Sequence, residues 1–264
     1  MKKLGIFLLI LANVAFGKIL EVSVGGGLKK IKQEVNLCYN KHPVSDSENV
    51  ELTKIEFDKK TVPFIYGKVD IFLLPAVELK YTEYNLTASL SDTLNFQFGN
   101  IQINGQDAKI ILDQNTKEIN LDFYYSFPFL NFIKWGLGFN ILDFDIKVRA
   151  KLEDETLKQD SLTHTVLYPY FYSALDLKTN RIILNIKFRY FPKLETDSFS
   201  AEYLSVSPLI GYRILSLPVI KLDTYVGYDY STLKLVINDE EIGHFNFERK
   251  NNNFEIGGII SLGF

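Results

Sequence analysis

Apolar and polar residues alternate along most of the chain with a period of two residues, the period of a strand and not of a helix. The final stretch, NFEIGGIISLGF, shows the alternation clearly, because Phe254 and Ile256 fall on one parity and Glu255 on the other. A pattern of this kind predicts a β-strand with one apolar face and one polar face.

The alternation recurs often enough to predict about ten antiparallel strands, and so an all-β fold. The predicted strands occupy 19–35, 61–73, 76–90, 119–127, 132–150, 164–176, 181–191, 199–214, 219–237 and 253–264. Long polar segments at 36–60, 91–107 and 151–162 alternate with tight turns at 74–75 and 178–180. Up-and-down barrels of the outer membrane separate short turns and long loops to opposite ends in this way. The 91–107 segment carries Asn104-Gly105, so a loop that includes a short hairpin is the alternative there.

One predicted strand, 132–150, changes its apolar parity part-way along. Up to Ile141 the apolar residues share one parity, and from Leu142 they share the other. One extra residue in a strand produces such a change, so the sequence predicts a β-bulge at this point.

The polar faces of the predicted strands carry too many charged residues for the dry interior of a soluble barrel. In a barrel with its apolar faces toward lipid, the same charges line the interior. The residues expected there are Glu21, Lys68, Asp70, Glu78, Lys80, Asp122, Lys147, Arg149, Lys187, Arg189, Arg213, Lys221, Asp223 and Glu255. About ten strands enclose a narrow interior, so we expect ion pairs to leave it closed or only narrowly open.

The amino-terminal stretch has the form of a secretory signal peptide. Lys2 and Lys3 precede an almost unbroken apolar run over 4–14, and small residues at 15 and 17 suit cleavage before Lys18. The run is shorter than the roughly 20 residues of a membrane-spanning helix. We therefore expect 1–17 to be a cleaved signal peptide for export to the periplasm, and 18–264 to form one barrel domain.

Composition narrows the range of functions only slightly. The net charge of −3 is near neutral and the charges are scattered, which gives no reason to expect a nucleic-acid partner. The single cysteine, Cys38, excludes an intrachain disulfide. No stretch matches a cofactor-binding motif in its required context, and we expect no cofactor.

The closing strand, which ends on Phe264, resembles the last strand of bacterial outer-membrane β-barrels. In those proteins the barrel-assembly machinery reads the terminal aromatic strand, which then pairs with the first strand. The stretches VSVGGGLKK, LLPAVELKYTEY, WGLGFNILD and YVGYDYSTLKL extend the resemblance to a small family of Gram-negative outer-membrane β-barrel proteins without assigned activity. The resemblance implies an outer-membrane location and an assembly signal at Phe264. It assigns no functional residues.

An outer-membrane enzyme is the main alternative. The omptin proteases also have about ten strands and, as a family, activate water between Asp and His residues at the outer rim. Here the candidates for a catalytic or zinc site are His42, His164, His244 and Cys38, which fall in or near predicted outer loops. Their spacing fits no ligand motif, so we expect neither an enzyme nor a metal site.

These features together predict a monomeric, lipid-embedded barrel of the outer membrane, with a structural, small-solute or surface-interaction role. A soluble, lipocalin-like binding barrel of the periplasm is a further alternative, because a soluble protein can expose the same charges on its outside. The face on which the apolar side chains lie distinguishes the two.

Overall fold

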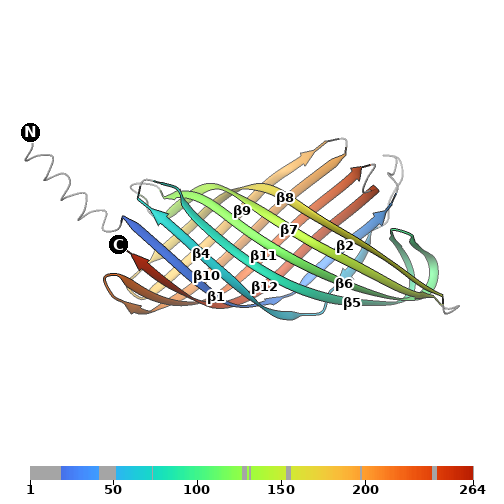
Figure 1. Cartoon of the computed structure of the whole chain (residues 1–264), viewed down its shortest axis with the longest axis horizontal. Helices are drawn as coiled ribbons and strands as arrows, with labels where there is room; N and C mark the ends of the chain where they lie inside the picture. Colours follow the sequence, from blue (N-terminus) through green and yellow to red (C-terminus); the bar gives the residue numbers. More distant parts are fainter. Residues whose placement is uncertain are drawn as a thin grey trace, which may run out of the picture.

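A computed structural model describes residues 19–41, 52–72, 74–126, 130, 132–152, 156–196, 198–239 and 243–263. These ranges form one twelve-stranded sheet in which β1 also pairs with β12, so the sheet closes into an elongated barrel (Figure 1). In the same ranges we find no helix with the length and hydropathy to cross a membrane.

The strands are β1 (Leu20–Ile31), β2 (Gln33–Asn40), β3 (Thr53–Glu56), β4 (Lys60–Ile71), β5 (Ala76–Phe98), β6 (Ile101–Ser126), β7 (Ile133–Leu152), β8 (Leu157–Lys178), β9 (Ile182–Glu195), β10 (Phe199–Ser216), β11 (Ile220–Asp239) and β12 (Gly243–Gly263). Glu21 of β1 lies opposite Gly263 of β12. Figure 1 shows the start of β1 and the arrowhead of β12 together at the left. We call this the terminal end, and the opposite end the far end.

The structure has more strands than the roughly ten that the alternation predicts. Lys32 separates β1 from β2, although both pair with β12. Residues 57–59 likewise separate β3 from β4, and β3 lies inside the predicted 36–60 loop. The extra strands therefore arise in two ways: Lys32 divides one predicted strand into β1 and β2, and β3 forms within a predicted loop.

The prediction of a loop at 91–107 is wrong, whereas the alternative of a hairpin in this stretch agrees with the structure. Strands β5 and β6 run through this stretch and turn at Gly99, whose φ of 57° lies in the left-handed region that glycine adopts readily. The polar residues here alternate with fully buried ones such as Phe98 and Ile101. They occupy the exposed face of a strand pair, and so their polarity does not indicate a loop.

Apolar side chains form an exposed belt around the terminal half of the barrel. On β12 the belt runs from Phe254, which is 52% exposed, to Leu262, a span of nine residues. A tilted transmembrane strand needs about 9–11 residues. Glu255, between two belt residues, is buried. The predicted orientation of this strand, with the apolar parity outward and Glu255 inward, is confirmed.

Both faces of the wall change polarity at the edge of the belt. On β7 the outward face is apolar up to Ile141, and the inward face becomes apolar from Leu142, which is 1% exposed. The register with β6 is continuous here, because Ile141 lies opposite Ile119 and Leu142 opposite Glu118. The predicted bulge is therefore wrong. The change of apolar parity marks a change of surroundings along a regular strand.

Two charges predicted for the interior lie outside for the same reason. The side chains of Lys147 and Arg149 are each 58% exposed and pair with Asp145 and Asp113. They share the outward parity of Trp135. The prediction was wrong because it took the apolar parity as outward along the whole strand, which holds only within the belt.

The far half of the barrel holds an apolar core. Within the described residues, β8 pairs with β9 only from Phe171 to Lys178, and the preceding part of β8 pairs with β7 alone. Phe144 of β7 stacks on Phe245 and Phe247 of β12, with ring centroids 5.6 Å apart in both pairs. Strands from opposite sides of the barrel thus meet across a packed interior.

Close packing also occurs nearer the terminal end, at Gly138 of β7. A Cβ atom at this position would lie 2.2 Å from a ring carbon of Tyr170, whereas one at Gly67 would meet no atom within 4 Å. We expect Gly138→Ala to lower the free energy of unfolding by about 1–3 kcal/mol, as overpacking does. Gly67→Ala is the matched control and is expected to change it little. Urea titration in detergent measures both, and an equal loss in the two variants would contradict the packing described.

Candidate functional site

A cavity of about 370 Å³ lies inside the terminal half of the barrel, lined by residues of every strand except β2 and β3. It extends to the terminal end, because Thr179 and Asn180 of the β8–β9 turn belong to its lining. The basic lining residues are Lys68, Lys80, Lys134, Lys178, Lys187, Arg213 and Lys221. The acidic ones are Glu21, Glu78, Asp176, Asp223 and Glu255.

Ion pairs connect opposite sides of this cavity. Lys187 of β9 pairs with Glu78 of β5, and Lys80 of β5 pairs with Glu255 of β12. In the ring, β5 is adjacent to neither β9 nor β12, so both pairs cross the interior. Strand alternation points each of these side chains inward, and the pairs then divide the space between the walls.

The other charges predicted for the interior of the terminal half pair nearer the wall. The pairs are Lys68 with Asp70, Arg213 with Asp223, and Lys221 with Glu21. The side chain of Asp70 is 44% exposed, and Asp70 lies near the terminal end. Arg213 and Asp223 make two hydrogen bonds, at 2.8 and 3.2 Å. A two-point contact of this kind fixes both side chains in one geometry.

A layer of buried polar side chains separates the cavity from the apolar core. We call this set, Lys29, Glu118, Asp122, Arg189, Asp229 and Arg249, the central polar layer. Arg189 donates to both carboxylate oxygens of Asp122, at 3.1 and 2.7 Å, and the Tyr170 hydroxyl donates to one of them at 2.7 Å. The side chains of Arg189 and Asp122 are 8% and 1% exposed. A charge this deeply buried is stable only with such partners.

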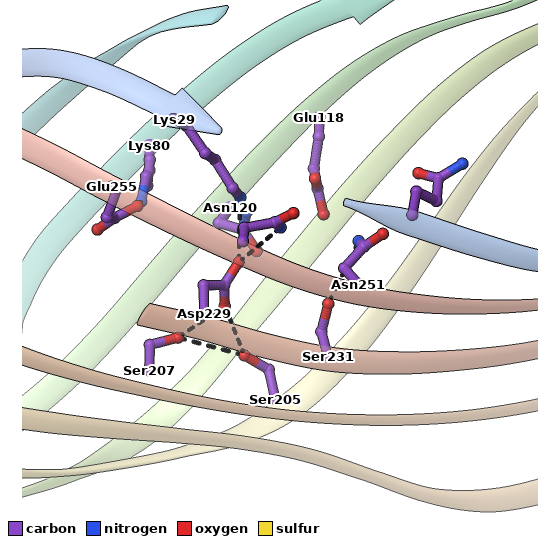
Figure 2. Close-up of polar contacts among 12 residues, drawn as sticks. Lys29, Lys80, Glu118, Asn120, Ser205, Ser207, Asp229, Ser231, Asn251 and Glu255 are labelled. Carbon is purple, nitrogen blue, oxygen red and sulfur yellow. Dashed lines mark hydrogen bonds and ion pairs between the residues drawn. The ribbon is translucent and has the colours of Figure 1, made fainter. Parts of the chain in front are cut away.

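The remainder of the layer is built in the same way. Figure 2 shows Lys29 and Ser207 approaching Asp229 from different strands, and the two side chains donate to its carboxylate at 3.0 and 2.8 Å. On the other side of the layer, Arg249 donates to Glu118 at 3.2 Å. Charged groups from five strands therefore satisfy one another across the middle of the barrel.

Sequence reasoning did not single out several of these interior residues, namely Lys29, Glu118, Lys134, Asp176, Asp229 and Arg249. For two of them a signal was present. Asp229 alternates with exposed Tyr228, and Lys134 precedes exposed Trp135, so strand parity alone assigns both to the interior. The partners themselves could not be read from the sequence, because each pair joins strands distant along the chain.

The two described histidines do not share a site. His164 has the inward parity of β8 and lies beside the Phe144 ring, at 6.2 Å between centroids. His244 precedes buried Phe245 and has the outward parity of β12. Burial lowers the pKa of both imidazoles from the ordinary value, which favours their neutral form at pH 7. The remaining candidate, His42, lies outside the described residues.

Metal binding finds no support in the described ranges, where no group of three or more His, Cys, Asp and Glu side chains is placed to hold an ion. Cys38 lies opposite Asn246 in the β2–β12 register, and His244 lies opposite Asn40. Cys38 and His244 are thus diagonal neighbours without a third ligand in that group. The predicted assembly signal at Phe264 and the predicted signal peptide at 1–17 lie outside the described residues.

The solved structures that resemble this one are Gram-negative outer-membrane β-barrel proteins. The outer membrane protease OmpT from Escherichia coli aligns over 93% of this chain and 96% of its own, with a TM-score of 0.51 and 11% identity. At this identity the likeness shows the fold alone. OprG from Pseudomonas aeruginosa (TM-score 0.38, 13% identity, 94% and 98% covered) and Ail from Yersinia pestis (0.31, 7%, 92% and 99%) are more distant. No family model matches the chain, and no curated protein matches its sequence.

Cys38 provides a test of the far half, where it is 1% exposed. Burial raises the pKa of its thiol to about 11, so at pH 8 only about one thiol in a thousand is ionised. We expect 5,5′-dithiobis(2-nitrobenzoic acid) to leave the folded protein unreacted and to titrate one thiol after unfolding in urea. Full reaction of the folded protein within minutes would show that Cys38 is accessible.

The central polar layer is tested by separating Arg189 from Asp122. Arg189→Met leaves a buried carboxylate without its cation, and we expect a loss of about 3–5 kcal/mol in the free energy of unfolding. Adding Asp122→Asn removes the unpaired charge, so the double variant is expected to recover part of the loss. Lys147→Met, at an exposed ion pair, is the control, with a change of about 1 kcal/mol or less. Wild-type stability in Arg189→Met would refute the buried pair.

Proposed function

We propose that the chain is an integral outer-membrane β-barrel protein, closed to free diffusion, with a structural or surface-interaction role. The belt of exposed apolar residues supports membrane insertion, since a water-soluble barrel turns its apolar face inward. The OmpT-like fold is consistent with an outer-membrane location. Belt length and fold together favour this proposal over a soluble periplasmic barrel.

The arrangement of the wall supports an orientation with the terminal end in the periplasm. When β1 with β2 and β3 with β4 are each taken as one interrupted strand, the described residues form a wall of ten segments. An even number returns the chain to the end from which it started, as in bacterial outer-membrane barrels. Tight turns such as 179–182 also lie at this end. The far half then stands outside the membrane and presents polar side chains to the surroundings.

The observation that carries the closed state is the order of inward side chains along β12. From the terminal end these pass from Glu255 at the cavity to Arg249 in the central polar layer, and then to Phe247 and Phe245 in the core. Both phenylalanines are 0% exposed. A water-filled pore would wet the whole row, whereas packed aromatic rings exclude water from the last part of it.

The proposal includes no catalytic role. His164 and His244 face opposite sides of the wall, and within the described ranges no specific arrangement favours an enzyme. The partners that we propose are outer-membrane lipid around the belt and the barrel-assembly machinery, which would act on the carboxyl-terminal strand. We propose a monomer, because the barrel closes on itself through the β1–β12 pairing.

Planar-bilayer recording tests the closed state. We expect the purified protein to insert without discrete conductance steps, because the packed core leaves no continuous water path along the interior. Flotation of the protein with lipid vesicles in the same preparation controls for insertion. Regular single-channel steps from protein that floats with the vesicles would show an open pore and contradict the proposal.

A further inference from the structure

Two buried oxygen atoms in the wall of the cavity have no hydrogen-bond partner within the described part of the chain. They are Oδ1 of Asp176 and Oδ1 of Asn185, and each residue is only 8% exposed. Asp176 and Asn185 are opposite each other in the β8–β9 register, and both line the cavity. Directly opposed strand residues have Cβ atoms about 4.5–5.5 Å apart. The cavity wall therefore holds two adjacent acceptors that lack donors, and because neither atom is itself exposed, a ligand reaches them only where a neighbouring side chain moves aside.

The second oxygen of Asp176 is surrounded by positive charge. The ammonium groups of Lys134 and Lys178 both pair with this atom, Lys178 at 2.9 Å. One carboxylate thus faces two cations, which leaves the subsite with a surplus of positive charge. Among the described lining residues of the whole cavity, seven are basic and five are acidic. This balance opposes a cationic ligand and favours an anionic one.

We infer that the cavity binds a small hydroxylated organic acid at a subsite formed by Lys134, Asp176, Lys178 and Asn185. The ligand's carboxylate accepts hydrogen bonds from the two lysines. Its hydroxyl groups donate to the two oxygens that otherwise lack donors, which removes the penalty of burying them unpaired. The Tyr124 ring, whose centroid lies 5.1 Å from Lys134 Nζ, helps to hold that ammonium group at the subsite. The volume of about 370 Å³ is sufficient for a sugar acid.

The ligand has direct access to this subsite from the terminal end. Lys178 is the last residue of β8 before the β8–β9 turn, and its side chain is 44% exposed. Thr179 and Asn180, the next two residues, also line the cavity. Binding therefore requires neither opening of the apolar core nor passage through the barrel. The inference concerns the cavity alone, and it is independent of the conductance expected of the protein.

Isothermal titration calorimetry on the detergent-solubilised protein tests the inference with three probes of similar size. Gluconate carries both the carboxylate and the hydroxyl groups, hexanoate carries only the carboxylate, and sorbitol carries only the hydroxyl groups. We expect saturable binding of gluconate to one site, at least about tenfold tighter than binding of either other probe. No saturable heat with gluconate, or equal affinity for sorbitol, would overturn the inference.

Two variants locate the binding, and a third controls for charge. Asn185→Leu removes one acceptor without changing the charge, and Lys178→Gln removes a cation at the partly exposed mouth. Each is expected to weaken gluconate binding about tenfold. Lys147→Gln makes the same charge change on the outer surface and is expected to leave the affinity unchanged. The Lys178 variant keeps the test decisive if Asn185→Leu does not fold. Unchanged affinity in Lys178→Gln would contradict the subsite.

Discussion

A side chain on an unbroken β-strand keeps to its own face, and this constraint governs the whole molecule. On β7 one face is apolar from Trp135 to Ile141 and then polar from Asp143 to Arg149, half-buried at the two aspartates and exposed at Lys147 and Arg149. The register shows no irregularity that could turn the strand over. The surroundings must therefore change along the barrel, from an apolar medium around the belt to water beyond it. The same strands therefore pass from the apolar medium into water.

The same constraint determines the interior, where the order of apolar and polar positions along the barrel is reversed. Within the belt the inward positions are polar, and ion pairs that cross the barrel, such as Lys80 with Glu255, compensate their burial. Beyond the belt the inward positions are apolar and pack as the core of a soluble domain does. The central polar layer lies between the polar interior of the belt region and the apolar core of the far half. As a consequence the cavity has one end in the solvent and the other against packed protein.

The orientation of the last strand was predictable because it depends only on local parity, which Phe254 and Glu255 already show. The predicted loop at 91–107 and the inward placement of Lys147 were wrong for one shared reason. Both assumed that polar residues of a strand face the interior along the whole chain. Beyond the edge of the belt they face outward instead. The unpaired oxygens of Asp176 and Asn185 could not be predicted. They depend on which donors reach a position across the barrel, and strand alternation carries no such information.

The change of surroundings along β7 can be measured with the chain's single tryptophan. Trp135 is 54% exposed on the belt, so its fluorescence in vesicles of acyl-brominated lipid is predicted to be strongly quenched relative to unbrominated vesicles. Moving the tryptophan along the same face, in Trp135→Phe with Lys147→Trp, is predicted to abolish the quenching, because position 147 faces water. Equal quenching at both positions, or none at Trp135, would contradict the account.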